Sequence, residues 1–147
     1  MAGLVLCDPI SLLLQHSDVA YNFVYRPSLA AAEIFFEWIA REQGIALTLG
    51  RNFHWFDNVF PLVPDVERNG GASVRFFPRE LATRVFLSER DCIVPTKRIA
   101  GLLGEKDGNV EVSVMPELDH GGFLFCHYWL DRVLTTLVEM EEDMGRK

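Results

Sequence analysis

Short apolar runs that lack polar alternation constrain the fold of this chain more than any other feature. Residues 3–7 form one such run, which ends at Asp8 and Pro9. An uninterrupted run of this length is typical of a strand that is buried on both faces, as in a parallel sheet. Residues 83–87, with the sequence TRVFL, predict a second buried strand. Residues 110–115 alternate between apolar and polar side chains, which predicts a third strand.

Helical patterns separate the three predicted strands. Short helical segments are expected at residues 10–15 and 45–59, and a strong helix is expected from Ser28 until Gly44 stops it. Residues 21–26 are aromatic and irregular. The order of strand, helical excursion, strand, helix, strand and helix predicts an α/β fold with a parallel sheet and right-handed crossovers.

The second half of the chain is expected to complete this sheet. Residues 60–79 are rich in proline and glycine, which predicts a loop with little regular structure. A helix is predicted over residues 95–103, and a last helix from about Phe123. The last helix is expected to bury one stripe, made of Cys126, Trp129, Leu130, Val133, Leu134 and Leu137.

Composition narrows the class of protein. The chain has 147 residues, of which 49% are hydrophobic, so residues 1–147 are expected to form a single domain with a real core. A net charge of -7 argues against binding to nucleic acid or to an anionic membrane surface. The apolar runs are shorter than the roughly 20 residues that cross a bilayer, so no membrane span is expected. Cys7, Cys92 and Cys126 are interpreted as reduced thiols, which predicts a cytoplasmic protein.

Three ionisable side chains follow the three predicted strands. Asp8 comes after the first strand, Asp91 after the second and His120 after the third. Groups at the carboxyl ends of parallel strands lie at one edge of the sheet, so these residues form one candidate site. A carboxylate beside an imidazole fixes its tautomer and stabilises the imidazolium that forms when it accepts a proton. Asp91 and His120 are therefore the candidate catalytic acid and base.

Each of these residues also has a structural interpretation. Asp91 taken alone would be a helix-capping acid ahead of Pro95, and His120 alone would be a loop histidine satisfied by the backbone. Asp8 would begin the helix that follows it. Asp119 suggests a metal ligand, but no further ligands follow at a suitable spacing, so neither a metal nor a cofactor is expected.

The segments VFLSERDCIVP and VMPELDHGGFL resemble the last two strand-end loops of the α/β-hydrolase fold. The resemblance covers residues 83–138 and implies that Asp91 is the catalytic acid and His120 the catalytic base. Ser88 stands where this superfamily usually has glycine. The implied fold is partial: a three-stranded parallel sheet edge with flanking helices and a helical lid.

The first part of the chain resembles the strand-six and lid region of uncharacterised eukaryotic, especially fungal, members of that superfamily. The segments that carry this likeness are LVLCDPISLLLQHSDVAYNFVYR and TLGRNFHWFDN. Residues 10–80 then form the lid, and Asp8 occupies the position of an alternative triad acid. The lid aromatics are either plain core or a pocket wall that favours an apolar or acyl substrate: Phe23, Tyr25, Phe35, Phe36, Trp38, Phe53, Trp55 and Phe56.

A serine nucleophile is missing from this pattern. None of the six serines lies in a Gly-x-Ser-x-Gly segment between a strand and a helix. The resemblance implies the C-terminal segment of a serine-type α/β-hydrolase that is inactive alone. The alternative is a non-catalytic module that pairs through residues 3–7 or through the lid, with a second copy or with a separate N-terminal half. A third hypothesis makes Cys7 or Cys92 a replacement nucleophile.

Overall fold

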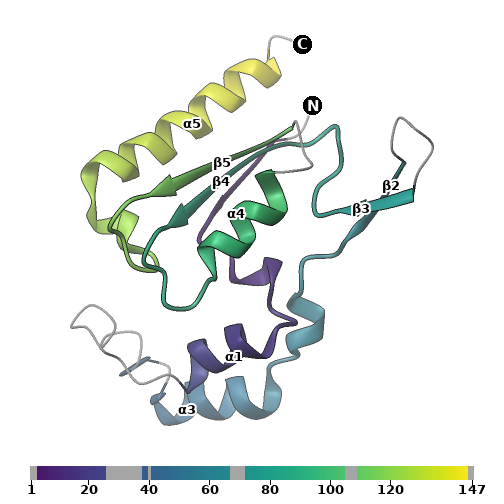
Figure 1. Ribbon diagram of the computed structural model, residues 1–147. Helices are drawn as coiled ribbons and strands as arrows, with labels where there is room; N and C mark the ends of the chain where they lie inside the picture. Colours follow the sequence, from purple (N-terminus) through teal and green to yellow (C-terminus); the bar gives the residue numbers. More distant parts are fainter. Residues whose placement is uncertain (1–2, 26–37, 40, 67–71, 105–108, 146–147) are drawn as a thin grey trace.

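The computed structural model describes residues 3–25, 38–39, 41–66, 72–104 and 109–145 (Figure 1). Its main element is a parallel sheet of three strands, β1 (Gly3–Cys7), β4 (Ala82–Ser88) and β5 (Val110–Met115), in the order β1-β4-β5. All three strands lie where the sequence predicts them. The α/β class with a parallel sheet is therefore confirmed.

Helices cover both faces of this sheet. On one face, α4 (Thr96–Gly104) packs Ile99 and Leu103 against Val85 and Leu87 of β4. On the other face lies α5 (His127–Gly145), whose Val133 packs with Phe86 of β4 and with Met115 (Figure 1). Because β4 is central and covered on both sides, its three consecutive residues Val85, Phe86 and Leu87 are all apolar and all buried. Complete burial of one such leucine contributes about 2 kcal/mol.

A helical segment follows β1 and lies beyond the carboxyl ends of the strands (Figure 1). Its elements are η1 (Ile10–Leu12), α1 (Ser17–Val24), α3 (Gln43–Leu47), the π-helical turn η2 (Thr48–Asn52) and η3 (Trp55–Asn58). Four of its apolar side chains belong to the main core: Leu12, Leu13, Leu14 and Val19. The segment is thus anchored to the sheet at its first turns.

Several predicted boundaries in this segment are wrong. The helix expected over residues 10–15 is a single 3-10 turn, and α1 occupies part of the stretch expected to be irregular. Gly44 does not end a helix; it lies in the first turn of α3, where the Glu42 side chain accepts a hydrogen bond from the Ile45 N–H. That capping bond starts a helix one residue before the glycine. The helix expected from Ser28 lies almost entirely outside the described residues.

The predicted loop over residues 60–79 contains an antiparallel pair of strands. These are β2 (Val63–Val66) and β3 (Ala72–Arg75), with Pro64 opposite Val74. Proline lacks the N–H of a ladder hydrogen bond, but a two-stranded sheet has an outer edge on each strand where no such bond is needed. The prediction of a loop was wrong because it relied on proline content, which an edge strand can accommodate.

The last helix begins later than expected, after a 3-10 turn, η4 (Gly122–Phe125). Its predicted buried stripe is partly wrong. Val133 is buried, but Leu134 and Leu137 are 51% and 45% exposed, and Thr136 takes the inner position instead. Only the side of α5 that faces the sheet is covered, so the apolar pattern is wider than the surface that buries it. No helix of the described chain has the length and apolar character to cross a membrane.

Candidate active site

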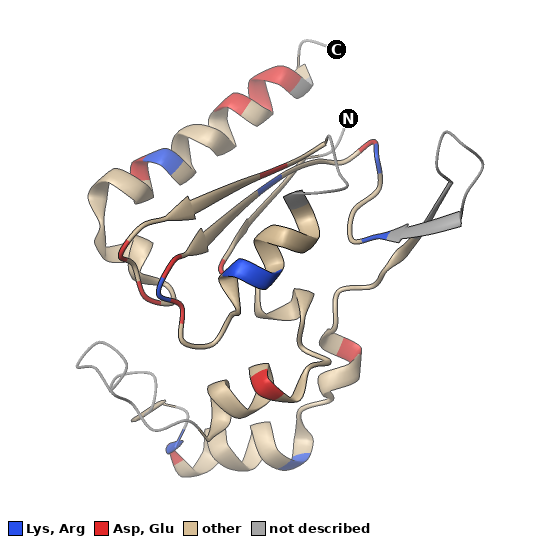
Figure 2. Ribbon diagram, viewed as in Figure 1, with Lys and Arg blue, Asp and Glu red and all other residues tan. Residues whose placement is uncertain are grey.

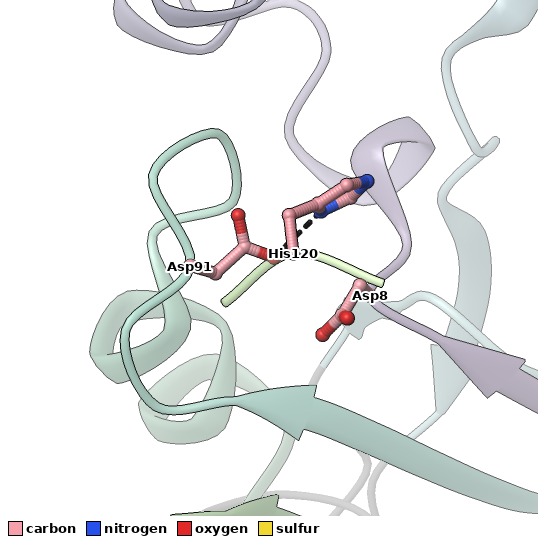
Figure 3. A group of neighbouring side chains, drawn as sticks. All are labelled: Asp8, Asp91 and His120. Carbon is pink, nitrogen blue, oxygen red and sulfur yellow. Dashed lines mark hydrogen bonds and ion pairs between the residues drawn. The ribbon is translucent and has the colours of Figure 1, made fainter. Parts of the chain in front are cut away.

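The three strand-end residues come together in the structure, as their positions in the sequence predict. One side-chain oxygen or nitrogen of each residue lies within 4.8 Å of those of the other two: Asp8, Asp91 and His120 (Figure 3). Acidic positions occur in the loops around this site (Figure 2), and Glu89 and Glu117 belong to the turns that follow β4 and β5. Glu117 pairs with Arg90 at 3.6 Å, so the carboxylates that act on the imidazole of His120 are those of Asp91 and Asp8.

Asp91 and His120 form a direct hydrogen bond. Nδ1 of His120 lies 2.7 Å from Oδ2 of Asp91, and the Asp91 side chain has no exposed surface. Oδ1 of Asp91 accepts hydrogen bonds from the N–H groups of Ile93 and Val94, both at 2.8 Å. One oxygen thus fixes the carboxylate to the turn ahead of α4, while the other meets the imidazole. Asp91 therefore binds backbone N–H groups of the turn that precedes α4 rather than capping the helix itself, and it binds the imidazole at the same time.

Asp8 is placed differently. It is 4% exposed, and its carboxylate accepts three hydrogen bonds: the Ser88 N–H to Oδ1 at 2.6 Å, and the Ser88 hydroxyl and Gly121 N–H to Oδ2 at 2.8 and 2.9 Å. The expectation that Asp8 begins a helix is wrong, because Pro9 precedes η1 and no side chain caps it. Asp8 instead joins the loops that carry Asp91 and His120.

The electrostatic environment raises the pKa of His120 above its ordinary value of 6.5. Burial is the largest single influence and opposes the charged form, but the hydrogen bond that His120 donates to Asp91 and the charges of Asp91 and Asp8 together outweigh it. An imidazole in this setting binds a proton more readily than one in water. That property suits a general base whose protonated form must be stabilised.

This raised pKa predicts a contribution to stability that is lost at alkaline pH. Because the folded-state pKa lies above the unfolded value, the contribution is full below 6.5 and disappears as pH rises through the folded-state pKa. We expect the free energy of unfolding to differ more between wild type and His120→Gln at about pH 5 than at about pH 9. Urea unfolding at both pH values measures this difference. His54→Gln is the control, since His54 also lies near an aspartate, Asp57, but its side chain is 78% exposed.

The thiol of Cys7 and the hydroxyl of Ser88 lie near the site but are not arranged as nucleophiles. Burial, and then the charge of Asp8, raise the pKa of Cys7 to about 11, which leaves almost no thiolate at neutral pH. Ser88 is fully buried and its hydroxyl donates to Asp8. Cys7, Cys92 and Cys126 are of intermediate burial, and none of the three is in a disulfide bond. Cys7 is therefore a poor candidate for the replacement nucleophile.

Among the described residues, one group of side chains has ligand atoms close enough to hold a metal ion, and it consists of Asp8, Asp91 and His120. Asp119, the metal candidate considered from the sequence, is not part of it. The oxygens of Asp8 and Asp91 already accept five hydrogen bonds from backbone and hydroxyl donors, besides the contact with His120. These donors use acceptor sites that a metal ion would need, so the set of contacts fits fixation of the two carboxylates better than metal binding.

A surface hollow of about 650 Å³ lies within the helical segment, between residues such as Tyr25, Arg41, Leu47 and Arg51. Neither Asp91 nor His120 lines it. It lies apart from the acid and base, and we assign it no part in the site.

Comparisons with known proteins identify no relative. No protein-family model matches the chain, and neither the curated proteins nor the solved structures contain a match. The assignment of the site therefore depends on its own geometry.

Sequence reasoning missed two parts of the site. The anchoring role of Asp8 and the backbone donor at Gly121 emerge only when β1 pairs with β4 and the loops meet. One signal was visible: Ser88 supplies a hydroxyl at a turn where the resembling superfamily has glycine, and that hydroxyl bonds to Asp8.

Proposed function

We propose that this chain carries the acid and base of a serine-type α/β-hydrolase, and that its nucleophile comes from a polypeptide segment outside this sequence. The observation that carries the proposal is the 2.7 Å contact between His120 Nδ1 and a buried Asp91 carboxylate whose other oxygen is held by two backbone N–H groups. Both residues lie at the carboxyl ends of adjacent parallel strands. The reaction class is hydrolysis of an ester, an amide or a similar carbonyl compound.

In this mechanism Asp91 accepts the Nδ1 proton of His120 in a hydrogen bond and thereby selects the neutral tautomer with a basic Nε2. Nε2 points away from Asp91 (Figure 3) and accepts the proton of the nucleophile's hydroxyl as the hydroxyl attacks the carbonyl carbon. The imidazolium that results is stabilised by Asp91 and, through space, by Asp8. His120 then donates the proton to the leaving group.

The helical segment supports the proposal of a lid. It follows β1 and extends over the carboxyl ends of the strands, the side on which Asp91 and His120 lie (Figure 1). Among its aromatics, Phe23, Phe53 and Trp55 pack against the core. Three others are well exposed, which makes the plain-core interpretation wrong for them: Tyr25, Trp38 and Phe56. Phe35 and Phe36 lie outside the described residues. Exposed aromatic side chains in a lid segment would favour an apolar or acyl substrate, and this substrate class is part of the proposal.

A second candidate function is a non-catalytic module that pairs with another chain. The observation in its favour is that β1 pairs only with β4 within the described sheet, so its other edge presents unpaired backbone groups. Leu134, Leu137 and Val138 of α5 add exposed apolar surface. This arrangement also suits the hydrolase proposal, because a sheet that continues past β1 would supply the missing nucleophile.

Hydrolysis of nitrophenyl esters of short and medium acyl length separates these functions. The assay compares the 147-residue chain with the product of the longest reading frame that contains it. We expect no His120-dependent rate from the chain alone, because losing the nucleophile removes nearly all catalysis by a triad. The longer product should hydrolyse the esters, with a Gly-x-Ser-x-Gly serine that an organophosphorus probe labels.

His120→Ala is the test variant in both proteins, and His54→Ala is its exposed counterpart. If the 147-residue chain alone hydrolyses the esters at a rate that depends on His120, the nucleophile lies within this chain. That result would refute the proposal of a nucleophile from another polypeptide segment. The hydrolase proposal would be refuted if the longer product lacks the serine motif, or if its hydrolysis rate is unchanged by His120→Ala. The proposal of a non-catalytic pairing module would then be favoured.

A further inference from the structure

Asp8 makes contacts that the proposed mechanism does not require. The mechanism uses Asp91 as the acid, yet a second carboxylate is buried beside the same imidazole and accepts three hydrogen bonds. Its backbone φ is 44°, in the left-handed region that side-chain-bearing residues rarely adopt. Aspartate adopts this region more readily than most residues, and here three hydrogen bonds hold its side chain in place. A buried carboxylate with these partners calls for a specific role.

The partners of Asp8 define that role. Ser88 lies three residues before Asp91, and Gly121 immediately follows His120. Oδ2 accepts from both loops at once, from the Ser88 hydroxyl and from the Gly121 N–H. We propose that Asp8 is a positioning residue that holds the loop of the base against the turn of the acid. The catalytic meaning of this role depends on the proposed function, but the geometry does not.

Other bonds between the two loops do not replace this contact. The Glu89 N–H donates to the Met115 carbonyl and the Arg90 N–H to the Leu118 carbonyl, both at 2.9 Å. These bonds secure the start of the β5 loop, two or more residues before His120. Gly121 is at φ 69° and begins η4, so the chain reverses direction beside the imidazole. Beyond His120, Phe123 packs against the cluster of Phe86 and Met115, and the bond from Gly121 to Asp8 ties the backbone next to the imidazole to the end of β1.

Asp8→Asn is the sharpest test, because asparagine has the same shape and tolerates a positive φ as aspartate does. Oδ1 must stay an oxygen to accept the Ser88 N–H, so the new NH₂ faces the Gly121 N–H, donor against donor. The Ser88 hydroxyl can rotate to accept, but a backbone N–H cannot. The substitution therefore breaks the link to the His120 loop. Ser88→Ala is the matched control, since it removes one bond to the same carboxylate and keeps that link.

The readout is ¹⁵N and ¹H NMR of the His120 ring in the full chain. For Asp8→Asn we expect loss of the downfield Nδ1 proton resonance and a His120 pKa lower than in wild type. Ser88→Ala should retain the resonance. Equal behaviour of both variants, or a ring spectrum unchanged by Asp8→Asn, would reduce Asp8 to a structural residue and overturn the inference.

A wild-type measurement keeps the inference testable if Asp8→Asn does not fold. The Gly121 amide should exchange its hydrogen about a hundredfold or more slowly than a glycine in an unfolded peptide, because exchange requires breaking its bond to Asp8. Unprotected exchange at Gly121 would overturn the positioning role. Neither NMR readout uses ester turnover, so failure of the hydrolase proposal and failure of this one remain distinguishable.

Discussion

Asp91→Asn is expected to lower kcat of the ester-hydrolysing longer product about 10⁴-fold. The Ile93 and Val94 N–H groups require an oxygen where Oδ1 now lies, so the new NH₂ group must face Nδ1 of His120. Nδ1 then has to be the acceptor, and the ring proton moves to Nε2. A protonated Nε2 cannot take the proton of a nucleophile, so the variant keeps its fold and loses its base.

The measurement is kcat for a nitrophenyl ester, with the concentration of folded protein verified by circular dichroism. Asp119→Asn is the matched control, because it neutralises a carboxylate adjacent to His120 in sequence that lies outside the group formed by Asp8, Asp91 and His120. A loss of less than about tenfold for Asp91→Asn would contradict its assignment as the acid that orients the base.

Phe77→Ala is expected to destabilise the protein by about 3–5 kcal/mol. Phe77 has no exposed surface, and its ring packs edge-on against Phe60 with centroids 5.0 Å apart, at the point where β3 leads back to the main core. Truncation loses the burial of the ring and leaves a cavity in a close-packed interior. A loss of that size is a large part of the roughly 5–15 kcal/mol that stabilises a typical domain.

Urea unfolding monitored by far-ultraviolet circular dichroism measures this change. Phe56→Ala removes the same side chain from a position that is 88% exposed, and it should shift the midpoint little. Similar midpoints for the two variants would mean that Phe77 is not part of the core. The comparison also tests how much the contact with Phe77 contributes to anchoring the helical segment, since Phe60 lies directly after η3, the last element of that segment.

The sheet could be predicted from the sequence because burial on both faces leaves a local signature. Leu6 and Val85 lie in runs that have no polar alternation, and they pair with each other in the parallel ladder. The β2–β3 pair could not be predicted in this way, because Pro64 contradicts a strand unless the strand is known to have a free edge. Helix boundaries failed where capping decided them, as Glu42 does at α3.

The meeting of Asp91 and His120 could be predicted because each lies in the loop that follows a strand of one parallel sheet. Asp91 and His120 needed only the order of elements, and their hydrogen bond agrees with that placement. The position of Asp8 followed the same rule, but its hydrogen-bond partners could not be predicted, because Ser88 and Gly121 lie 80 and 113 residues away in the chain. A local pattern carries no information on which distant backbone donors a carboxylate will meet.

Those separations also govern the order of folding. Closing a long loop costs chain entropy before the contact it makes can stabilise anything, so structures dominated by distant pairs form slowly. The bond between Gly121 and Asp8 joins residues 113 positions apart and requires β1, β4 and the end of β5 to be in place first. We therefore expect the sheet and α4 to form before the imidazole is oriented. The chemical centre of this chain would then be the last part of it to mature, and a partly folded chain would carry the right residues with no competent site.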